Sequence, residues 1–298
     1  MTTHPKPATA DFTGAAHNRL IADVYGEDGP PVLLLHGGGQ TRHAWKKTAE
    51  DLARKGWVAY ALDQRGHGDS DWLESGAYHF SDYGTDVGAI ARTLTARHGV
   101  PPVVIGASLG GISALLAEGE AQKKKQAPLY SALVLVDITP RVDLSGVAKI
   151  QGFMRAHAKE GFASIAEAAN AVAAYLPHRP KPPSHEGLRK NLRLHADGRW
   201  RWHWDPRFLD GPRPVDDGRM AVEADLQKAA AGLKIPVMLV RGASSELVQE
   251  DHVKEFLKLA PHAQYADVTG ARHMVAGDRN DQFSAAIMNF LSGISLEE

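Results

Sequence analysis

The sequence has no cysteine and no excess of either charge. Without cysteine, the chain can form no disulfide, no thiolate metal site and no covalent intermediate on a thiol. A chain without disulfides fits a reducing compartment, so we expect a cytoplasmic protein. The 34 lysines and arginines balance 35 aspartates and glutamates, giving a formal net charge of −1 at pH 7. This balance argues against nucleic acid or an anionic membrane surface as a partner.

Long apolar runs and metal-binding motifs are also missing. No segment approaches the length of a membrane-spanning helix, and residues 1–12 lack the apolar centre of a secretory signal. The 15 histidines are scattered, without an HExxH motif and without two histidines on one helix face beside a carboxylate. We therefore expect no membrane association and no bound metal ion.

Short apolar runs alternate with helical patterns along most of the chain. The runs are nearly continuous in valine, isoleucine and leucine, which is typical of strands buried on both faces of a parallel sheet. Strands are predicted at 19–26, 31–36, 57–63, 102–106, 132–137, 235–241 and 264–269, and helices at 42–55, 80–98, 108–121, 249–259 and 278–292. This alternation predicts an α/β fold, a mostly parallel twisted sheet flanked by helices. The first strand is expected to pair antiparallel through a hairpin.

One segment interrupts the alternation. Residues 139–232 contain no convincing buried strand, but they carry helical patterns and the aromatic stretch GRWRWHWDPRF. We interpret this segment as a helical cap inserted into a core domain formed by residues 1–138 and 233–298.

The stretch VVIGASLGG at 103–111 places Ser108 in the pattern Gly-x-Ser-x-Gly. It follows a predicted strand and precedes a helix rich in alanine and leucine, which is the setting of a nucleophile elbow. In such an elbow the serine has a positive φ, and Gly106 and Gly110 leave room for the turn. The alternative is a serine that caps the helix. The position directly after a strand favours Ser108 as a nucleophile.

A second glycine run, LLLHGGGQ at 33–40, offers backbone donors to a negative charge. We expect the N–H groups of Gly38 and Leu109 to form a two-donor oxyanion hole. A phosphate-binding loop would need the pattern GxGxxG or GxxxxGK[ST], and this loop has neither. Nucleotide binding is therefore disfavoured.

The general base is predicted on the loop after the last strand, where His273 lies. His262 precedes that strand and is the weaker candidate. Glu246, in the turn after the penultimate strand, is the preferred carboxylate to support His273. Asp137, at the end of the run ALVLVD, is the alternative, and the residues alone leave this choice open.

Aromatic and apolar side chains near these loops are candidates for a substrate pocket. In GRWRWHWDPRF the tryptophans at 200, 202 and 204 alternate, which would place them on one face of an extended segment. The alternative is that they pin the cap to the core. The predicted pocket residues are Trp45, Trp202, Phe153 and Met274, and they suggest an apolar small-molecule ester as the substrate.

These motifs together resemble the α/β-hydrolase fold family over nearly the whole chain. The order Ser108, Glu246, His273 matches the family's order of nucleophile, acid and base, and HGGGQTRHAW, DQRGHGDS and HMVAGDRNDQF resemble its oxyanion loop, the segment after its fourth strand and its histidine loop. Within the family the chain is similar to the capped, cofactor-free haloperoxidase and esterase-like group. That group usually has aspartate in the turn where this chain has Glu246, which keeps Asp137 under consideration.

The resemblance implies a serine hydrolase that uses no cofactor and cleaves a carboxylic ester or lactone through an acyl-enzyme. One alternative is a C–C bond hydrolase or perhydrolase that uses the same triad. Another is a non-catalytic ligand-binding protein on the same scaffold.

Overall fold

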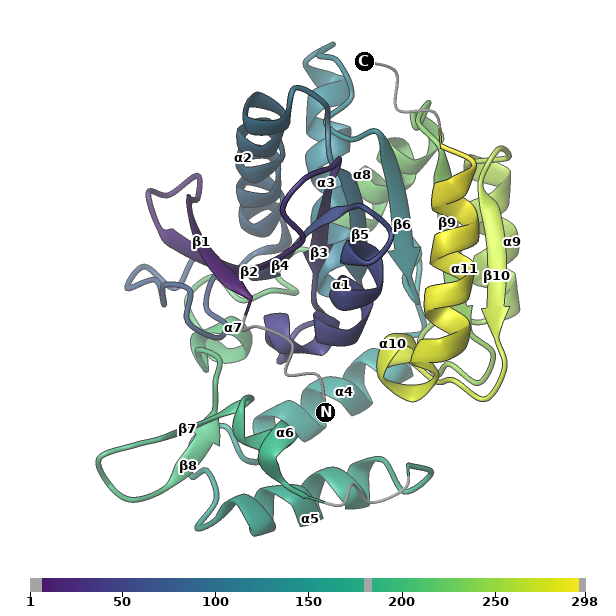
Figure 1. The fold of residues 1–298 in the computed structure, drawn as a ribbon. Coiled ribbons are helices and arrows are strands. Elements are labelled where there is room, and N and C mark those ends of the chain that lie inside the picture. Colours follow the sequence, from purple (N-terminus) through teal and green to yellow (C-terminus); the bar gives the residue numbers. More distant parts are fainter. Residues whose placement is uncertain (1–6, 180–183, 295–298) are drawn as a thin grey trace.

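Eight strands pair into one sheet in the computed structural model, which describes residues 7–179 and 184–294 (Figure 1). They are β1 (Ala8–Thr13), β2 (Arg19–Tyr25), β3 (Pro31–Leu35), β4 (Val58–Asp63), β5 (Val103–Ala107), β6 (Ala132–Val136), β9 (Val237–Gly242) and β10 (Gln264–Val268). Their order across the sheet is β1-β2-β4-β3-β5-β6-β9-β10. β1 is antiparallel to β2 and β2 to β4, whereas all other neighbours are parallel.

The mostly parallel sheet and the antiparallel hairpin at its start are confirmed. β1 is an addition that the sequence analysis does not contain. Its sequence ATADFT has no apolar run, and Phe12 is its one buried residue. An edge strand exposed on most of its length has no strong hydrophobic pattern, so sequence reasoning cannot detect it.

The central strands are buried on both faces, and two hydrophobic cores result. Leu33 and Leu35 point to one side of β3, and Val32 and Leu34 point to the other; all four are fully buried. Burying each such side chain contributes about 1.5–3 kcal/mol. The alternation along a single strand therefore holds helices against both faces of the sheet.

Helices cover the two faces in separate layers. One face carries α1 (Lys46–Ala53), which follows the short 3₁₀ helix η1 (Arg42–Trp45), and α11 (Asn280–Ser292). The other face carries α2 (Phe80–His98), α3 (Leu109–Lys123), α8 (Arg219–Ala231) and α9 (Glu250–Leu259). The short helix α10 (Val275–Asp278) precedes α11.

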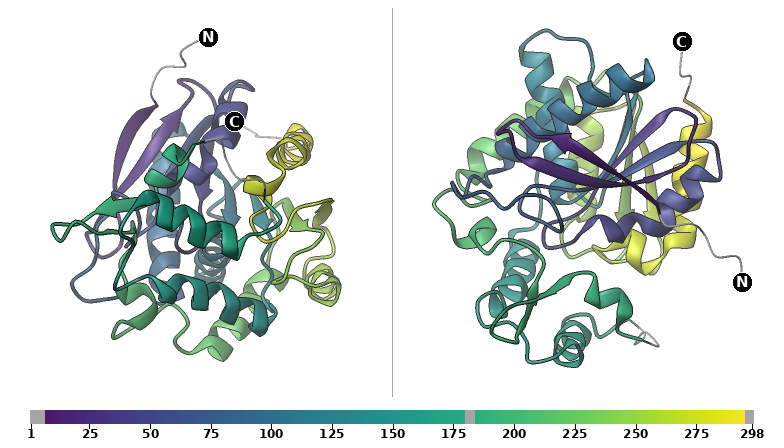
Figure 2. Two further views of the ribbon diagram at one scale, coloured as in Figure 1. Left: turned by 90° about the horizontal axis from the view of Figure 1, so that it is seen from below. Right: turned by 60° about the vertical axis from the view of Figure 1, so that its left-hand side comes forward.

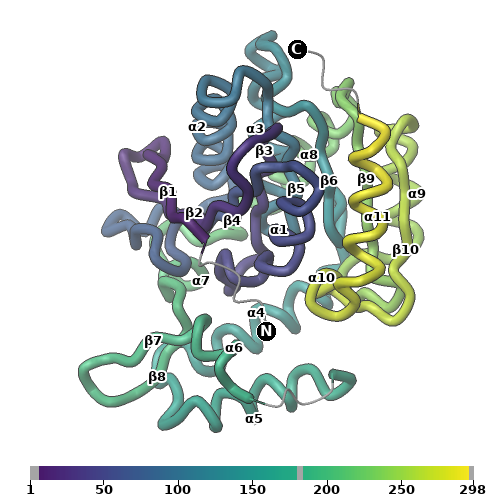
Figure 3. The backbone as a smooth tube through the Cα atoms, viewed as in Figure 1, coloured from purple at the N-terminus to yellow at the C-terminus, as the bar shows by residue number. Residues whose placement is uncertain are grey.

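A separate group of elements lies at the carboxyl ends of the parallel strands. It comprises α4 (Leu144–Ala156), α5 (Ile165–Tyr175), α6 (Glu186–Arg189), the hairpin β7 (Leu192–Leu194) and β8 (Trp200–Trp202), and α7 (Arg207–Asp210). Figure 2 shows these elements in front of the strand ends when the molecule is seen from below. In Figure 3, α4 runs between the sheet and α5. We refer to residues 139–211 as the cap.

The cap differs from the sequence prediction in two respects. It contains the β7–β8 hairpin, whereas the sequence predicts a helical cap; β8 lies in the alternating tryptophan segment, which was expected to be extended. Helix α8 lies within the predicted cap range 139–232, yet it packs on α3, where Gln122 donates a hydrogen bond to the carbonyl of Ala229. The division into core and cap at residues 138/139 and 232/233 stays a prediction.

Within the described ranges, the structure contains no helix that is both long and apolar enough to cross a membrane.

Candidate active site

Ser108 lies on a sharp turn between β5 and α3, with φ 47° and ψ −113°. Its side chain makes no hydrogen bond that caps the helix. A positive φ at a residue with a side chain costs about 1–3 kcal/mol and persists mainly where function requires it. The backbone thus has the geometry of a nucleophile elbow, and helix capping does not account for it.

Gly106 and Gly110 give this turn its space. A Cβ atom on Gly106 would lie 2.6 Å from the backbone of Gly110, and one on Gly110 would collide with the carbonyl oxygen of Leu35. Neither position has room for a side chain. The glycine spacing therefore reflects close backbone contacts on both sides of Ser108.

His273 follows β10, and its Nδ1 lies 2.8 Å from Oδ2 of Asp137. The carboxylate of Asp137 is completely buried after β6, whereas the His273 side chain is 15% exposed. The preference for Glu246 as the partner of His273 is wrong in this geometry. Among the described residues, Glu246 has no hydrogen bond or ion pair with His273, and the alternative, Asp137, takes that position.

Backbone and side-chain donors explain why Asp137 faces His273. Asp137 has φ 49°, and its Oδ1 accepts a hydrogen bond from the N–H of Gly242 at 3.0 Å. Oδ2 accepts a second bond from Oγ of Ser245 at 2.5 Å. Ser245 is a site residue that the sequence analysis misses. Ser245 lies one position before Glu246, in the turn that follows β9. This turn therefore supports the carboxylate that follows β6 and does not supply one of its own.

In the glycine loop after β3 the N–H groups of Gly37 and Gly39 are committed and that of Gly38 is available. The N–H of Gly39 donates to Nε2 of His67 at 3.0 Å. The N–H groups of Gly38 and Leu109 have no acceptor among the described residues, and a Cβ on Gly37 would lie 3.5 Å from Cβ of Ser108. The loop therefore lies against the serine, and two backbone donors there are free to bind a developing negative charge.

His67 and His36 hold this loop as buried neutral rings. Both side chains are fully buried, and their ring centroids are 5.1 Å apart. Burial lowers the pKa of His36 to about 4, and burial together with the nearby His36 lowers the pKa of His67 to about 3. An unprotonated Nε2 is what allows His67 to accept the hydrogen bond from Gly39.

These two histidines make stability depend on pH. Their folded pKa values lie below the ordinary value of about 6.5, so the unfolded chain binds more protons as the pH falls from about 6.5 to 4. We expect each histidine to reduce the free energy of unfolding by about 1.4 kcal/mol per pH unit within that window. His67→Gln should flatten the curve of urea-measured stability against pH, while exposed His185→Gln should not. Parallel curves for wild type and His67→Gln would contradict this.

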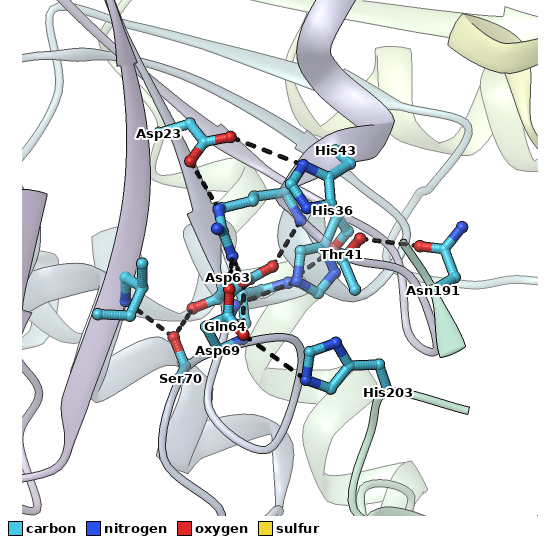
Figure 4. Close-up of polar contacts among 12 residues, drawn as sticks. Asp23, His36, Thr41, His43, Asp63, Gln64, Asp69, Ser70, Asn191 and His203 are labelled. Carbon is cyan, nitrogen blue, oxygen red and sulfur yellow. Dashed lines mark hydrogen bonds and ion pairs between the residues drawn. The ribbon is translucent and has the colours of Figure 1, made fainter. Parts of the chain in front are cut away.

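A buried polar cluster fixes the segment that follows the glycine loop. Arg42 donates through Nε to Asp23 at 2.8 Å and through Nη1 to Asp63 and Asp69, and Figure 4 shows these three aspartates grouped there. Thr41 donates to Oδ1 of Asn191 in the cap at 2.8 Å. The segment that follows the glycine loop is thereby tied to the core and to the cap at the same point.

The predicted pocket residues have different environments. Trp45 is not in a pocket but in the core on the α1 and α11 face, with its ring centroid 5.9 Å from that of Phe283. Trp202 is buried inside the cap against Phe162, at 5.1 Å. A tryptophan packed in a hydrophobic core is shielded from solvent. The spacing of tryptophans in the sequence does not reveal in which core each one packs.

Phe153 and Met274 remain candidates for substrate contact. Phe153 on α4 is half-buried and stacks on Tyr175 of α5 at 4.1 Å between centroids. Met274 is half-buried directly after His273.

Met154 and Phe208 cover the glycine loop from the cap side. Cε of Met154 would lie 2.9 Å from a Cβ on Gly39, and Cζ of Phe208 would lie 3.1 Å from a Cβ on Gly38. The pocket residues predicted from the sequence include neither of them. Their sequence surroundings carry no signal that places them over this loop.

The described residues contain no group of three or more histidine, cysteine, aspartate or glutamate side chains arranged to hold a metal ion. The chemistry available at the strand ends is that of a serine, a histidine–carboxylate pair and backbone donors.

Comparison with known proteins finds a matching family model and similar proteins that are named as an esterase and a hydrolase. A family model described as alpha/beta hydrolase fold matches residues 30–279. Esterase Rv0045c of Mycobacterium tuberculosis is 31% identical over 245 residues, covering 80% of this chain and 74% of that protein. The 2-(acetamidomethylene)succinate hydrolase of Mesorhizobium japonicum is 28% identical over 277 residues, covering 88% of both. A crystal structure of E-2-(acetamidomethylene)succinate hydrolase has a TM-score of 0.80 and 24% identity, covering 96% of this chain and 100% of that chain.

Proposed function

Because the chain belongs to the α/β-hydrolase fold family, we propose that it is a serine hydrolase that cleaves a carboxylic ester or lactone. Its relatives are named as hydrolases, which supports hydrolase activity in this chain. The observation that carries the proposal is the hydrogen-bonded pair of His273 and Asp137 at the same sheet edge as the strained Ser108.

In the proposed acylation step, Nε2 of His273 takes the proton from Oγ of Ser108 as that oxygen attacks the carbonyl carbon. The carbonyl oxygen becomes an oxyanion and accepts hydrogen bonds from the N–H groups of Gly38 and Leu109. The tetrahedral intermediate then breaks the bond to the leaving alcohol, and His273 returns the proton to that alcohol. The product of this half-reaction is an ester of Ser108.

Deacylation repeats these steps with water as the nucleophile. His273 removes a proton from water, the hydroxide oxygen attacks the acyl carbon, and the proton goes to Oγ of Ser108 as the acid leaves. Throughout, Asp137 accepts the Nδ1–H of His273 and stabilises the imidazolium. The bonds from Ser245 and Gly242 hold that carboxylate in place.

The esterase relative supports ester cleavage. The second relative supports a second candidate reaction. The 2-(acetamidomethylene)succinate hydrolase is named for a substrate with an acetamido group. We therefore include hydrolysis of an amide-type acyl bond by the same residues as the second candidate. The mechanism above applies to it with an amine nitrogen in place of the alcohol oxygen.

Covalent labelling tests the proposed nucleophile. We expect a fluorophosphonate probe to add one phosphonyl group to the protein, on Ser108, as shown by intact mass and peptide mapping. The reaction needs both an activated serine and an oxyanion site, since the phosphonyl oxygen mimics the tetrahedral intermediate. Ser108→Ala should remain unlabelled. Labelling of that variant at the wild-type rate would overturn the proposal.

A further inference from the structure

Glu246 is a half-buried acid to which the proposed mechanism gives no role. Its Oε2 is buried and has no hydrogen-bond partner, and it is the one carboxylate oxygen of this kind among the described residues. No ion pair involving Glu246 occurs in residues 7–179 and 184–294. Buried carboxylate oxygens are normally satisfied by donors, because leaving one unpaired costs the full desolvation penalty. Glu246 therefore has an unused capacity to accept a hydrogen bond.

The position of Glu246 places this capacity beside the catalytic groups. The preceding residue, Ser245, donates to Asp137, which in turn pairs with His273. The backbone carbonyl of Glu246 lies where a Cβ on Gly146 of α4 would be, so the turn packs against the first part of α4. The turn that carries Ser245 and Glu246 thus contacts both the cap and the carboxylate that pairs with His273.

Tyr175 is a cap residue that lies close enough to Glu246 to be affected by its charge. Burial, and next the charge of Glu246, raise the pKa of Tyr175 to about 12, so the phenol stays protonated and has an O–H to donate. Tyr175 lies on α5 and stacks on Phe153 of α4. The neighbour of Phe153, Met154, reaches the glycine loop. Three neighbouring cap residues, Tyr175, Phe153 and Met154, therefore lead from Glu246 to the glycine loop.

The Glu246 carboxylate and the stacked pair of Phe153 and Tyr175 together favour a particular chemical group at the end of the substrate. A carboxylate oxygen without a donor attracts a cation that carries N–H groups, and a stacked aromatic pair packs well against methylene groups. A terminal ammonium on a short aliphatic chain supplies both features. An anionic end would instead meet a like charge in a partly buried site.

We propose that Glu246 binds a protonated primary amine at the end of the substrate remote from the scissile bond. This assignment rests on the proposed function, because it takes Ser108 as the reacting residue. Glu246 would then determine specificity, and Asp137 alone would support the base.

Three esters of matched length test the assignment: ethyl 6-aminohexanoate, ethyl heptanoate and monoethyl adipate. They end in an ammonium, a methyl and a carboxylate group. We expect wild type to favour the amino ester over the methyl ester in kcat/KM, and Glu246→Gln to reduce that ratio at least tenfold. The control is Glu250→Gln, which removes an exposed carboxylate from the first turn of α9 and should leave the ratio as in wild type.

A binding measurement separates this proposal from the proposed function. In the Ser108→Ala background, where no acyl-enzyme forms, NMR titration with the same three esters gives dissociation constants without turnover. We expect the amino ester to bind most tightly, and the added Glu246→Gln change to remove its advantage over ethyl heptanoate. Equal binding of these two esters in Ser108→Ala, or tightest binding of monoethyl adipate, overturns the role of Glu246 whether or not the esters are hydrolysed.

Discussion

Ser108→Ala is expected to lower kcat/KM for p-nitrophenyl butanoate by about 10⁴–10⁶-fold. The change removes the oxygen that we propose to form the acyl-enzyme, while the glycine loop and the His273–Asp137 pair stay in place. The residual rate should come from the oxyanion donors and from binding alone. Initial rates over a range of substrate concentration, with purified protein at matched concentrations, measure the loss.

Ser113→Ala is the matched control for this variant. Ser113 lies one turn into α3, is buried, and donates to the carbonyl of Leu109 at 2.6 Å. It therefore shares the helix and the residue type of Ser108 without reaching the strand end. We expect its kcat/KM to stay within a few-fold of wild type. Equal turnover by wild type and Ser108→Ala would show that another group is the nucleophile.

Asp137→Asn is expected to reduce the acylation rate by about 10³–10⁴-fold. Asparagine keeps the shape but removes the negative charge that stabilises the imidazolium of His273. It also presents an amide that can point its NH₂ group at Nδ1, which then holds the wrong tautomer. Pre-steady-state release of p-nitrophenol from p-nitrophenyl butanoate measures the acylation step directly.

The comparison with Glu246→Gln identifies the acid. Glu246 has no bond to His273 in the described residues, so its amide variant should lose far less acylation rate with this neutral ester than Asp137→Asn does. Circular dichroism and thermal unfolding would show that both variants fold. A greater loss in Glu246→Gln than in Asp137→Asn would reverse the assignment.

The turn at Ser108 and the position of His273 at the strand ends were predictable because local sequence patterns encode them. The glycines at 106 and 110 are required by contacts that any side chain would break, and His273 follows from its place after the last strand. The carboxylate that pairs with His273 was not predictable in the same way. Asp137 and Glu246 both follow neighbouring parallel strands, and the choice between them depends on the positive φ of Asp137 and on the hydroxyl of Ser245. Neither feature has a signature in a single sequence.

The sequence predicts a cap from the loss of strand–helix alternation after residue 138, but it does not predict the contacts of that cap. The alternating tryptophans predicted an extended segment, part of which is β8. The tertiary contacts of large aromatic side chains were missed. Trp45 fills a core on one side of the sheet, whereas Phe208 reaches the glycine loop from the cap. Such long-range contacts arise from the packing of elements distant in the chain.

The position of Asp137 has a consequence for protein engineering. Asp137 is the residue at which the chain leaves the sheet for the cap, and α4 begins at Leu144, within a few residues of it. A chimera that exchanges the cap for one from a relative has to keep residues 132–143 of this chain, or it replaces the proposed acid along with the cap. The same chimera must also keep Ser245, which lies on the far side of the insertion, because the hydroxyl there and the carboxylate at Asp137 form one hydrogen-bonded unit. Caps can therefore be exchanged only among relatives that carry this carboxylate after the same strand.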